Sequence, residues 1–342
     1  MFKPFDGVRK ISHLILHHTG YNNTDAAIQI YKDYGVSAHY LIDLDGNIFR
    51  LVNDNDIAWH AGVSNWKGVE SLNQYSIGIE LLSPNPYKDG FNEKQMKNLI
   101  ALCQGLISSY NIKPLNVLAH SDISYDRITG YLNRKQDPSY LFDWKLLAQN
   151  GVGFFPDTTP TERLDRIAFQ NGDNDPEIIK IRKFLSEIGY KVEQEKPEYN
   201  EELAYAVRVF NRRYNQRPFV QGGDHDYHET ENRIPPIGGA AYQLSLFSLM
   251  QLNKLLQEAI RTNYSNIDFE PITPPKINHP SELTFKIGAA VLLAALALAT
   301  IYCLNKLHKR PNNTVSLNHG NMEMGNKKYQ SLGGENASRS NN

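Results

Sequence analysis

The sequence predicts an α/β domain with a mixed central β-sheet flanked by helices, then a small all-α domain of three helices, then one C-terminal transmembrane helix. Three observations lead to this prediction. Strand-like apolar runs alternate with helical patterns over the first half of the chain, which is typical of layered domains built on a central sheet. Three helical patterns follow. Near the end lies an uncharged apolar run long enough to span a membrane.

Local signals define the elements of the first domain. Short apolar runs bounded by turn residues indicate strands, and apolar residues three and four apart indicate helices. Asp45-Gly46 between two apolar runs is a hairpin signature, and Asn92 with Gln95 forms a helix cap. The expected strands lie at 13–17, 76–82 and 116–120, with a hairpin over 39–52, and the expected helices lie at 24–34 and 92–110.

Length and composition divide the chain further. Its 342 residues exceed the usual size of one domain, so two folded units with accessory segments are expected. In the second region, helical spacing recurs around Ile181, Val207 and Leu252, and an irregular insertion spans 215–239. We expect domains at 1–155 and 161–262, a proline-rich linker at 263–286, a transmembrane helix at 287–304 and a disordered tail at 305–342.

The charge balance argues against one class of partner. Acidic and basic side chains nearly cancel, leaving a formal net charge of -1, so there is no bulk electrostatic reason to expect a nucleic acid. Cys103 and Cys303 lie in a helical pattern and an apolar run, where they are not expected to pair. Partners must therefore be inferred from local sites.

The apolar run at 287–304 predicts a lipid bilayer as one partner. It reads IGAAVLLAALALATIYCL, and Lys286 and Lys306 bracket it. A buried helix of a hairpin is the alternative interpretation. Lys309 and Arg310 favour a cytosolic tail, whereas the start of the chain has no apolar stretch typical of a signal peptide. Both orientations in the membrane therefore stay open.

Histidines and an aspartate near predicted strand ends are candidates for a metal site. His17 and His18 end one strand, His120 ends another, and Asp137 lies in the loop after it. A hydrolytic zinc site needs three protein ligands of this kind and an open position for water. The spacing carries no local metal signature, so structural roles for these histidines stay open on the residues alone.

Four ordered motifs resemble a known family. LILHHT, AWHAG, SIGIE and LAHSDI, within residues 11–153, are similar to motifs of the type 2 N-acetylmuramoyl-L-alanine amidases, in their AmiD/AmpD-like branch. The resemblance implies hydrolysis of the muramoyl to L-alanine bond of peptidoglycan or muropeptides, in the bacterial cell envelope. It also implies one catalytic Zn²⁺ held by His17, His120 and Asp137.

The resemblance further implies two catalytic residues. Lys135, two residues before Asp137, stands where the family places a lysine that stabilises oxyanion charge. Related phage enzymes carry a tyrosine at the position of Ala38, whereas the AmiD-like branch uses the glutamate of SIGIE, which is Glu80 here. A salt bridge for Glu80 and a solvated loop charge for Lys135 are the alternatives.

The AWHAG element implies a substrate-binding wall. In this family an aromatic side chain beside small residues lines the groove for sugar and peptide. His18 and His39 are interpreted as structural or as supporting the ligands. The expected substrate-binding residues are Trp59, His60, Ala61, Asn65 and Trp66.

Two departures from the family pattern concern the loop before Asp137. Extra residues lie at 128–133, and the common Asp-Pro-Gly is Asp137-Pro138-Ser139 here. The longer loop is expected to alter access to the metal or to act as a lid.

The second region resembles a three-helix peptidoglycan-binding domain through FLSEIGYKV and YNEELAYAVRVFNRRY. The histidines and acids at 225–229 are interpreted as a polar loop. Two other functions stay open: a non-catalytic peptidoglycan-recognition protein, and a tail-anchored protein that acts outside its own cell.

Overall fold

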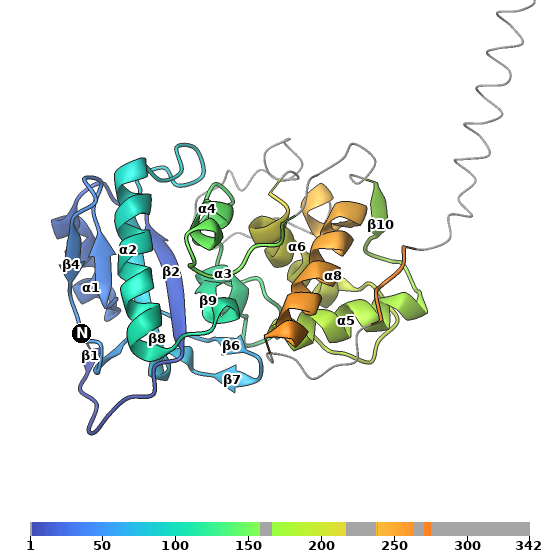
Figure 1. Cartoon of the computed structure of the whole chain (residues 1–342), viewed down its shortest axis with the longest axis horizontal. Coiled ribbons are helices and arrows are strands. Elements are labelled where there is room, and N and C mark those ends of the chain that lie inside the picture. The colour runs from blue at the N-terminus through green and yellow to red at the C-terminus, as the bar shows by residue number, and fades with distance from the viewer. Residues whose placement is uncertain (1, 158–165, 217–236, 238, 263–269, 275–342) are drawn as a thin grey trace, which may run out of the picture. The chain divides into compact units, whose positions relative to one another are not determined.

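The computed structural model describes residues 2–157, 166–216, 237, 239–262 and 270–274. All of them belong to one compact unit, Met1–Lys276, drawn as ribbon in Figure 1. The predicted transmembrane helix at 287–304, the tail at 305–342 and most of the 215–239 insertion lie outside the described residues. Within the described ranges, every helix is too short or too polar to cross a bilayer.

A five-stranded mixed sheet forms the centre of the first region. Its order is β4 (Ile48–Arg50), β3 (Tyr40–Ile42), β8 (Ser76–Leu82), β2 (His13–Thr19) and β9 (Val117–Ala119). β4 pairs antiparallel with β3, as the Asp45-Gly46 hairpin signature predicts, and the other neighbours are parallel. The mixed α/β sheet predicted from the sequence is therefore confirmed.

Two helices with well-formed N-termini flank this sheet. In α1 (Thr24–Tyr34), the Asn23 side chain accepts from the backbone N–H of Ala26, and α2 (Glu93–Tyr110) begins with a complete Asn92/Gln95 capping box. One sheet face packs on α2 (Figure 1). That buried layer contains Leu14, Leu16, Ile77, Ile79 and Leu81 of the strands with Met96, Leu99, Cys103 and Leu106 of α2.

Short elements complete the first region. The strand pairs are β1 (Phe2–Lys3) with β5 (Ile57–Ala58), and β6 (Asn65–Trp66) with β7 (Val69–Glu70). The short helices are α3 (His120–Ile123) and α4 (Trp144–Gln149), with 3-10 turns at Leu72–Gln74 and Pro114–Asn116. β6 and β7 make a small hairpin beside the sheet (Figure 1).

The second region contains the three helices that the apolar spacing predicts. They are α5 (Pro176–Ile188), α6 (Glu201–Tyr214) and α8 (Leu246–Arg261). A strand pair, β10 (Ile167–Phe169) with β11 (Leu244–Ser245), and a 3-10 turn at Ala240–Tyr242 accompany them. The sequence did not predict this pair, because strands of two or three residues give too few positions for an alternating pattern.

One hydrophobic cluster joins the second sheet face to the helical region. Side chains alternate along a strand, so Ile15 faces away from α2. The cluster contains Ile15, Trp66, Leu118 and Ile123 from the first region, with Ile181, Leu185, Val207, Phe210 and Leu252 among the residues of the helical region.

Candidate active site

The sheet register brings candidate residues to one edge. His17 of β2 and Glu80 of β8 are register partners in a parallel pair, so their side chains point to the same face. Ala119 pairs with Leu16, and His120 follows Ala119 at the end of β9. The carboxyl ends of three parallel strands therefore place His17, Glu80 and His120 together.

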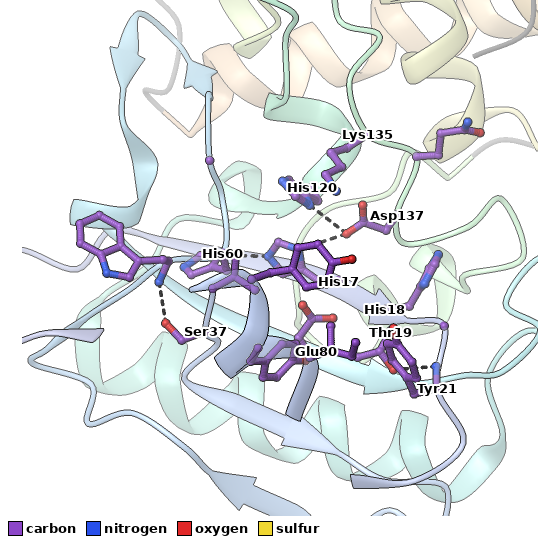
Figure 2. A pocket seen from close by; sticks show the side chains of 18 of the residues that line it. His17, His18, Thr19, Tyr21, Ser37, His60, Glu80, His120, Lys135 and Asp137 are labelled. Atoms are coloured by element: carbon purple, nitrogen blue, oxygen red, sulfur yellow. Dashed lines mark hydrogen bonds and ion pairs between the residues drawn. The ribbon is translucent and has the colours of Figure 1, made fainter. Parts of the chain in front are cut away.

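Asp137 completes the group from the loop after α3. Its Oδ2 lies 3.0 Å from Nδ1 of His17 and 3.0 Å from Nδ1 of His120. Figure 2 shows the three side chains pointing toward one another, with Glu80 and Lys135 nearby. The three potential ligand atoms all lie within 4.8 Å of one another. Two imidazole nitrogens and one carboxylate oxygen at this spacing fit a mononuclear metal site of the kind that zinc occupies.

Burial and neighbouring charges shift the pKa values of Asp137 and His120 toward the protonation states that metal ligands need. Burial alone would raise the pKa of Asp137, but the imidazoles of His120 and His17 hold that pKa well below its usual value. Burial lowers the pKa of His120 to about 4, against the opposing effect of Asp137. Near neutral pH the aspartate is therefore ionised and His120 is neutral, which are the protonation states that metal binding requires.

Nε2 of His17, the outer ring nitrogen that faces away from Asp137, is the end of a chain of hydrogen bonds. Ser76 Oγ donates to the Leu72 carbonyl at 2.6 Å, so it is free to accept from Nε2 of His60, 3.3 Å away. Nδ1 of His60 can then accept from Nε2 of His17 at 3.1 Å. This leaves Nδ1 of His17 as the lone-pair nitrogen that faces Asp137.

Two of the predicted substrate-binding residues, His60 and Ala61, contact the predicted ligands, and His60 also lines the pocket beside them. His60 packs above Gly78 of β8, where any added Cβ would overlap the imidazole ring. The carbonyl oxygen of Ala61 lies 3.1 Å from Nε2 of His120 and accepts from it. Both residues contact the outer nitrogen of a predicted ligand, which fixes the tautomer and the ring orientation.

Glu80 and Lys135 line a pocket that opens beside the triad. The pocket has a volume of about 850 Å³. Among the described residues, Oε2 of Glu80 is buried without a hydrogen-bond partner. Burial raises the pKa of Glu80 to about 7, while His17 opposes that rise. A carboxyl group in this state can exchange a proton near neutral pH.

Aromatic and apolar side chains form much of the remaining pocket wall. Trp59 lines it, as the AWHAG motif predicts, and its backbone N–H donates to Ser37 Oγ at 2.9 Å. Tyr31 lines it from α1, and its hydroxyl is buried without a partner among the described residues. Sequence reasoning missed Tyr31, whose only signal is its place on a helix beside the strand ends. The other lining residues of this kind are Tyr21, Tyr34, Val36, Pro84, Pro86 and Tyr87.

Trp66 and Asn65 lie outside this pocket. The Trp66 side chain is 1% exposed and stacks edge-on against Tyr190 with ring centroids 5.1 Å apart. Its indole also occupies the space beside Gly189, where a Cβ would overlap it. The structure thus differs from the expected substrate wall, because the β6–β7 hairpin turns Trp66 toward the helical region.

His39 and His18, which the sequence suggested as structural or supporting residues, differ in their surroundings. His39 accepts from the backbone N–H of Gly78 at 3.0 Å through Nδ1 and supports the strand below His60. His18 lines the pocket, and neither ring nitrogen has a partner among the described residues. Burial lowers the pKa of His18 to about 4, so its ring is neutral near pH 7.

Comparisons with known proteins agree with this geometry. The family description N-acetylmuramoyl-L-alanine amidase (Amidase_2) matches residues 7–140. The amidase AmiD of Escherichia coli (strain K12) is 32% identical over 233 residues, which cover 64% of this chain and 79% of AmiD.

Two solved structures share the fold. The E. coli AmiD complex with anhydro-N-acetylmuramic acid-L-Ala-D-gamma-Glu-L-Lys superposes with a TM-score of 0.54 at 26% identity, covering 74% of this chain and 91% of that one. AmpDh3 from Pseudomonas aeruginosa in complex with anhydromuramic pentapeptide has a TM-score of 0.55 at 23% identity, covering 74% and 93%.

A mixed sheet that brings a His-His-Asp triad and a buried glutamate to one edge is an arrangement that fits a hydrolase with a single metal ion. The chain belongs to the Amidase_2 family of N-acetylmuramoyl-L-alanine amidases. It is an amidase that acts on peptidoglycan or muropeptides. The triad of His17, His120 and Asp137 is consistent with a metal site typical of that family.

Proposed function

We propose that this amidase uses one Zn²⁺, held by His17, His120 and Asp137, to hydrolyse the amide between the muramoyl lactyl group and L-alanine. The observation that carries the proposal is the position of Asp137 Oδ2, 3.0 Å from Nδ1 of both histidines, with Glu80 as the register partner of His17. Zinc is the metal that this borderline donor set suits best.

The proposed reaction needs an activated water molecule and a group that transfers its proton. A zinc ion held there would supply Lewis-acid activation of water and of the amide carbonyl. Glu80 accepts the proton of the attacking water, because burial raises the pKa of its carboxyl to about 7. Glu80 then returns this proton to the L-alanine nitrogen as the bond between the lactyl carbon and that nitrogen breaks.

Lys135 and the pocket wall act on the substrate. The Lys135 side chain lines the pocket two residues before Asp137, and its ammonium stabilises the negative charge that develops on the carbonyl oxygen. Trp59 contributes an aromatic surface for the sugar or the peptide stem. His60 and Ala61 support this reaction by orienting His17 and His120.

We propose muropeptides with a peptide stem as the substrate class. The pocket volume of about 850 Å³ lies in the range of about 300–1,000 Å³ common for ligand sites. The related AmiD and AmpDh3 structures hold anhydromuramic peptides. Peptidoglycan binding by the helical region stays a prediction from its sequence.

Release of free stem peptide from purified peptidoglycan and from an anhydro-muropeptide tests the proposal. We expect the full chain to release peptide from at least one of them, and a chelator to abolish release until Zn²⁺ is added back. Release that persists in a zinc-free, chelated enzyme would contradict the zinc proposal. Binding of peptidoglycan by the zinc-loaded chain without any release would instead support the recognition protein that the sequence left open.

We propose that residues 287–304 anchor the chain in a membrane of the bacterial cell envelope. The support is the uncharged sequence of this segment between Lys286 and Lys306. The full chain is expected to remain with membranes through an alkaline carbonate wash, whereas a chain ending at Pro280 is expected in the supernatant. Recovery of the full chain in the wash would refute the anchor.

A further inference from the structure

A buried ion pair links the helical region to the segment that carries His120. Nη1 of Arg213, in α6, donates to Asp122 Oδ2 in α3 at 2.6 Å. The side chains are 2% and 0% exposed. Nη2 of the same guanidinium donates to the Val117 carbonyl at 2.8 Å, and its centre lies 4.2 Å above the Trp144 ring. Arg213 therefore holds the start of β9 and the turn after it at once.

The Asp122 carboxylate organises the residues on both sides of His120. Its Oδ2 accepts from the backbone N–H of Ala119 at 2.8 Å, and its Oδ1 accepts from the Tyr190 hydroxyl at 3.2 Å. Tyr190 also belongs to the helical region, where it follows α5. A buried carboxylate is costly unless donors satisfy it, and here two of the three donor groups come from the helical region.

The loop that carries Lys135 and Asp137 is held from the same side. Nζ of Lys191 donates to the Gly130 carbonyl at 3.3 Å, and the rings of Tyr131 and Tyr205 lie 5.9 Å apart. The helical region thus reaches the inserted residues of this loop.

The contact extends to the residue between Lys135 and Asp137. Nη2 of Arg212, beside Arg213 in α6, donates to Gln136 Oε1 at 3.4 Å. Two of the three metal ligands, His120 and Asp137, therefore lie on segments that α6 contacts directly, whereas the third, His17, lies on a central strand.

We propose that Arg213 is a positioning residue of the metal site: its ion pair with Asp122 fixes the turn that carries His120, and the helical region is thereby part of the catalytic unit. This inference rests on the proposed zinc function. Outer partners that orient metal ligands typically contribute 10- to 100-fold, roughly, to metal affinity. Arg213 is outside both the pocket lining and the His-His-Asp triad, so its effect passes through Asp122.

Zinc affinity of the full chain, measured by competition with a chromophoric chelator, tests this inference. We expect Arg213→Met, which keeps an unbranched apolar stem and removes the charged guanidinium, to weaken zinc binding about 10- to 100-fold. Arg208→Met is the matched control. Arg208 is equally buried in the same helix, but its guanidinium lies over Tyr242 within the helical region, at 5.4 Å. This control is expected to lose stability and to keep wild-type zinc affinity.

The outcomes separate the two proposals. An Arg213→Met chain that binds zinc as tightly as wild type overturns the positioning role, and so does an equal loss of affinity in Arg208→Met. If Arg213→Met does not fold, Tyr190→Phe decides, because it removes one hydrogen bond to Asp122. That variant is expected to bind zinc more weakly, by up to about fivefold, the full value of one hydrogen bond, and unchanged affinity overturns the inference. A wild-type chain that binds no zinc overturns the proposed function as well.

Discussion

Replacing Glu80 with glutamine is expected to lower kcat for muramoyl to L-alanine cleavage by about 10²- to 10⁴-fold, the usual contribution of a positioned general base. The amide has nearly the shape of the carboxyl group but cannot take the proton of water. Zinc affinity should remain at the wild-type value, because Glu80 is not one of the three clustered ligand residues. Stem-peptide release and chelator competition on the same preparation measure both quantities.

The pH dependence gives this prediction a second readout. Burial raises the pKa of Glu80 to about 7 in the metal-free protein, and the positive charge of a bound zinc ion would lower it. The base form is lost as the pH falls through that pKa, so wild-type kcat/KM should fall on the acid side, with a midpoint at or below about pH 7. In Glu80→Gln this limb should be absent.

Glu93→Gln is a suitable control, because Glu93 is an exposed glutamate at the start of α2. It should keep wild-type activity and pH profile. A Glu80→Gln enzyme that retains more than about a tenth of wild-type kcat would exclude Glu80 as the base. Loss of zinc together with activity would instead assign Glu80 a structural role in the metal site.

The sequence predicted the elements that carry the site, because their signals are local. The short apolar run of β2 and the capping box of α2 depend on residues a few positions apart. Parallel pairing then places strand ends at one edge, which explains why His17 and His120 meet. The assignment of His17, His120 and Asp137 together as metal ligands came from the family resemblance, since a loop residue such as Asp137 has no period that predicts its place.

The features that escaped prediction depend on contacts between distant residues. His60 could turn toward His17 only because Gly78 leaves room above β8. The Trp66 ring packs against Tyr190, a residue of the helical region, and therefore does not line the pocket. The same holds for the Arg213 to Asp122 ion pair, whose partners are 91 positions apart. Apolar spacing alone does not specify such pairs.

Two of these distant contacts, Trp66 with Tyr190 and Arg213 with Asp122, join the helical region to the first region. Hydrophobic residues of both regions form one cluster, and the buried Arg213 lies at its edge beside β9. Breaking a buried ion pair by removing one partner typically costs about 3–5 kcal/mol. A chain cut between the two regions would leave the Asp122 carboxylate without two of its donors. The first region alone is therefore expected to bind zinc more weakly than the full chain does.

Replacing Asp137 with asparagine is expected to remove both zinc binding and activity. The neutral amide lacks the charge that pairs with two imidazoles, and its oxygen is a weak zinc ligand. Because a direct ligand is lost, zinc affinity should fall by more than the roughly 10- to 100-fold typical of an outer partner. Peptide release should fall at least as far as in Glu80→Gln, about 10²- to 10⁴-fold.

The exposed loop residue Asp89 provides the matched control, and Asp89→Asn should bind zinc and release peptide as wild type does. Chelator competition and stem-peptide release, each at several zinc concentrations, distinguish the possible roles of Asp137. If excess zinc restores full activity to Asp137→Asn, the aspartate serves only affinity. If zinc binds normally while activity is lost, Asp137 is not a ligand, and the triad must be reassigned around His17 and His120. Joint loss of both, with an intact Asp89→Asn enzyme, is the result that the 3.0 Å contacts of Asp137 with the two imidazoles predict.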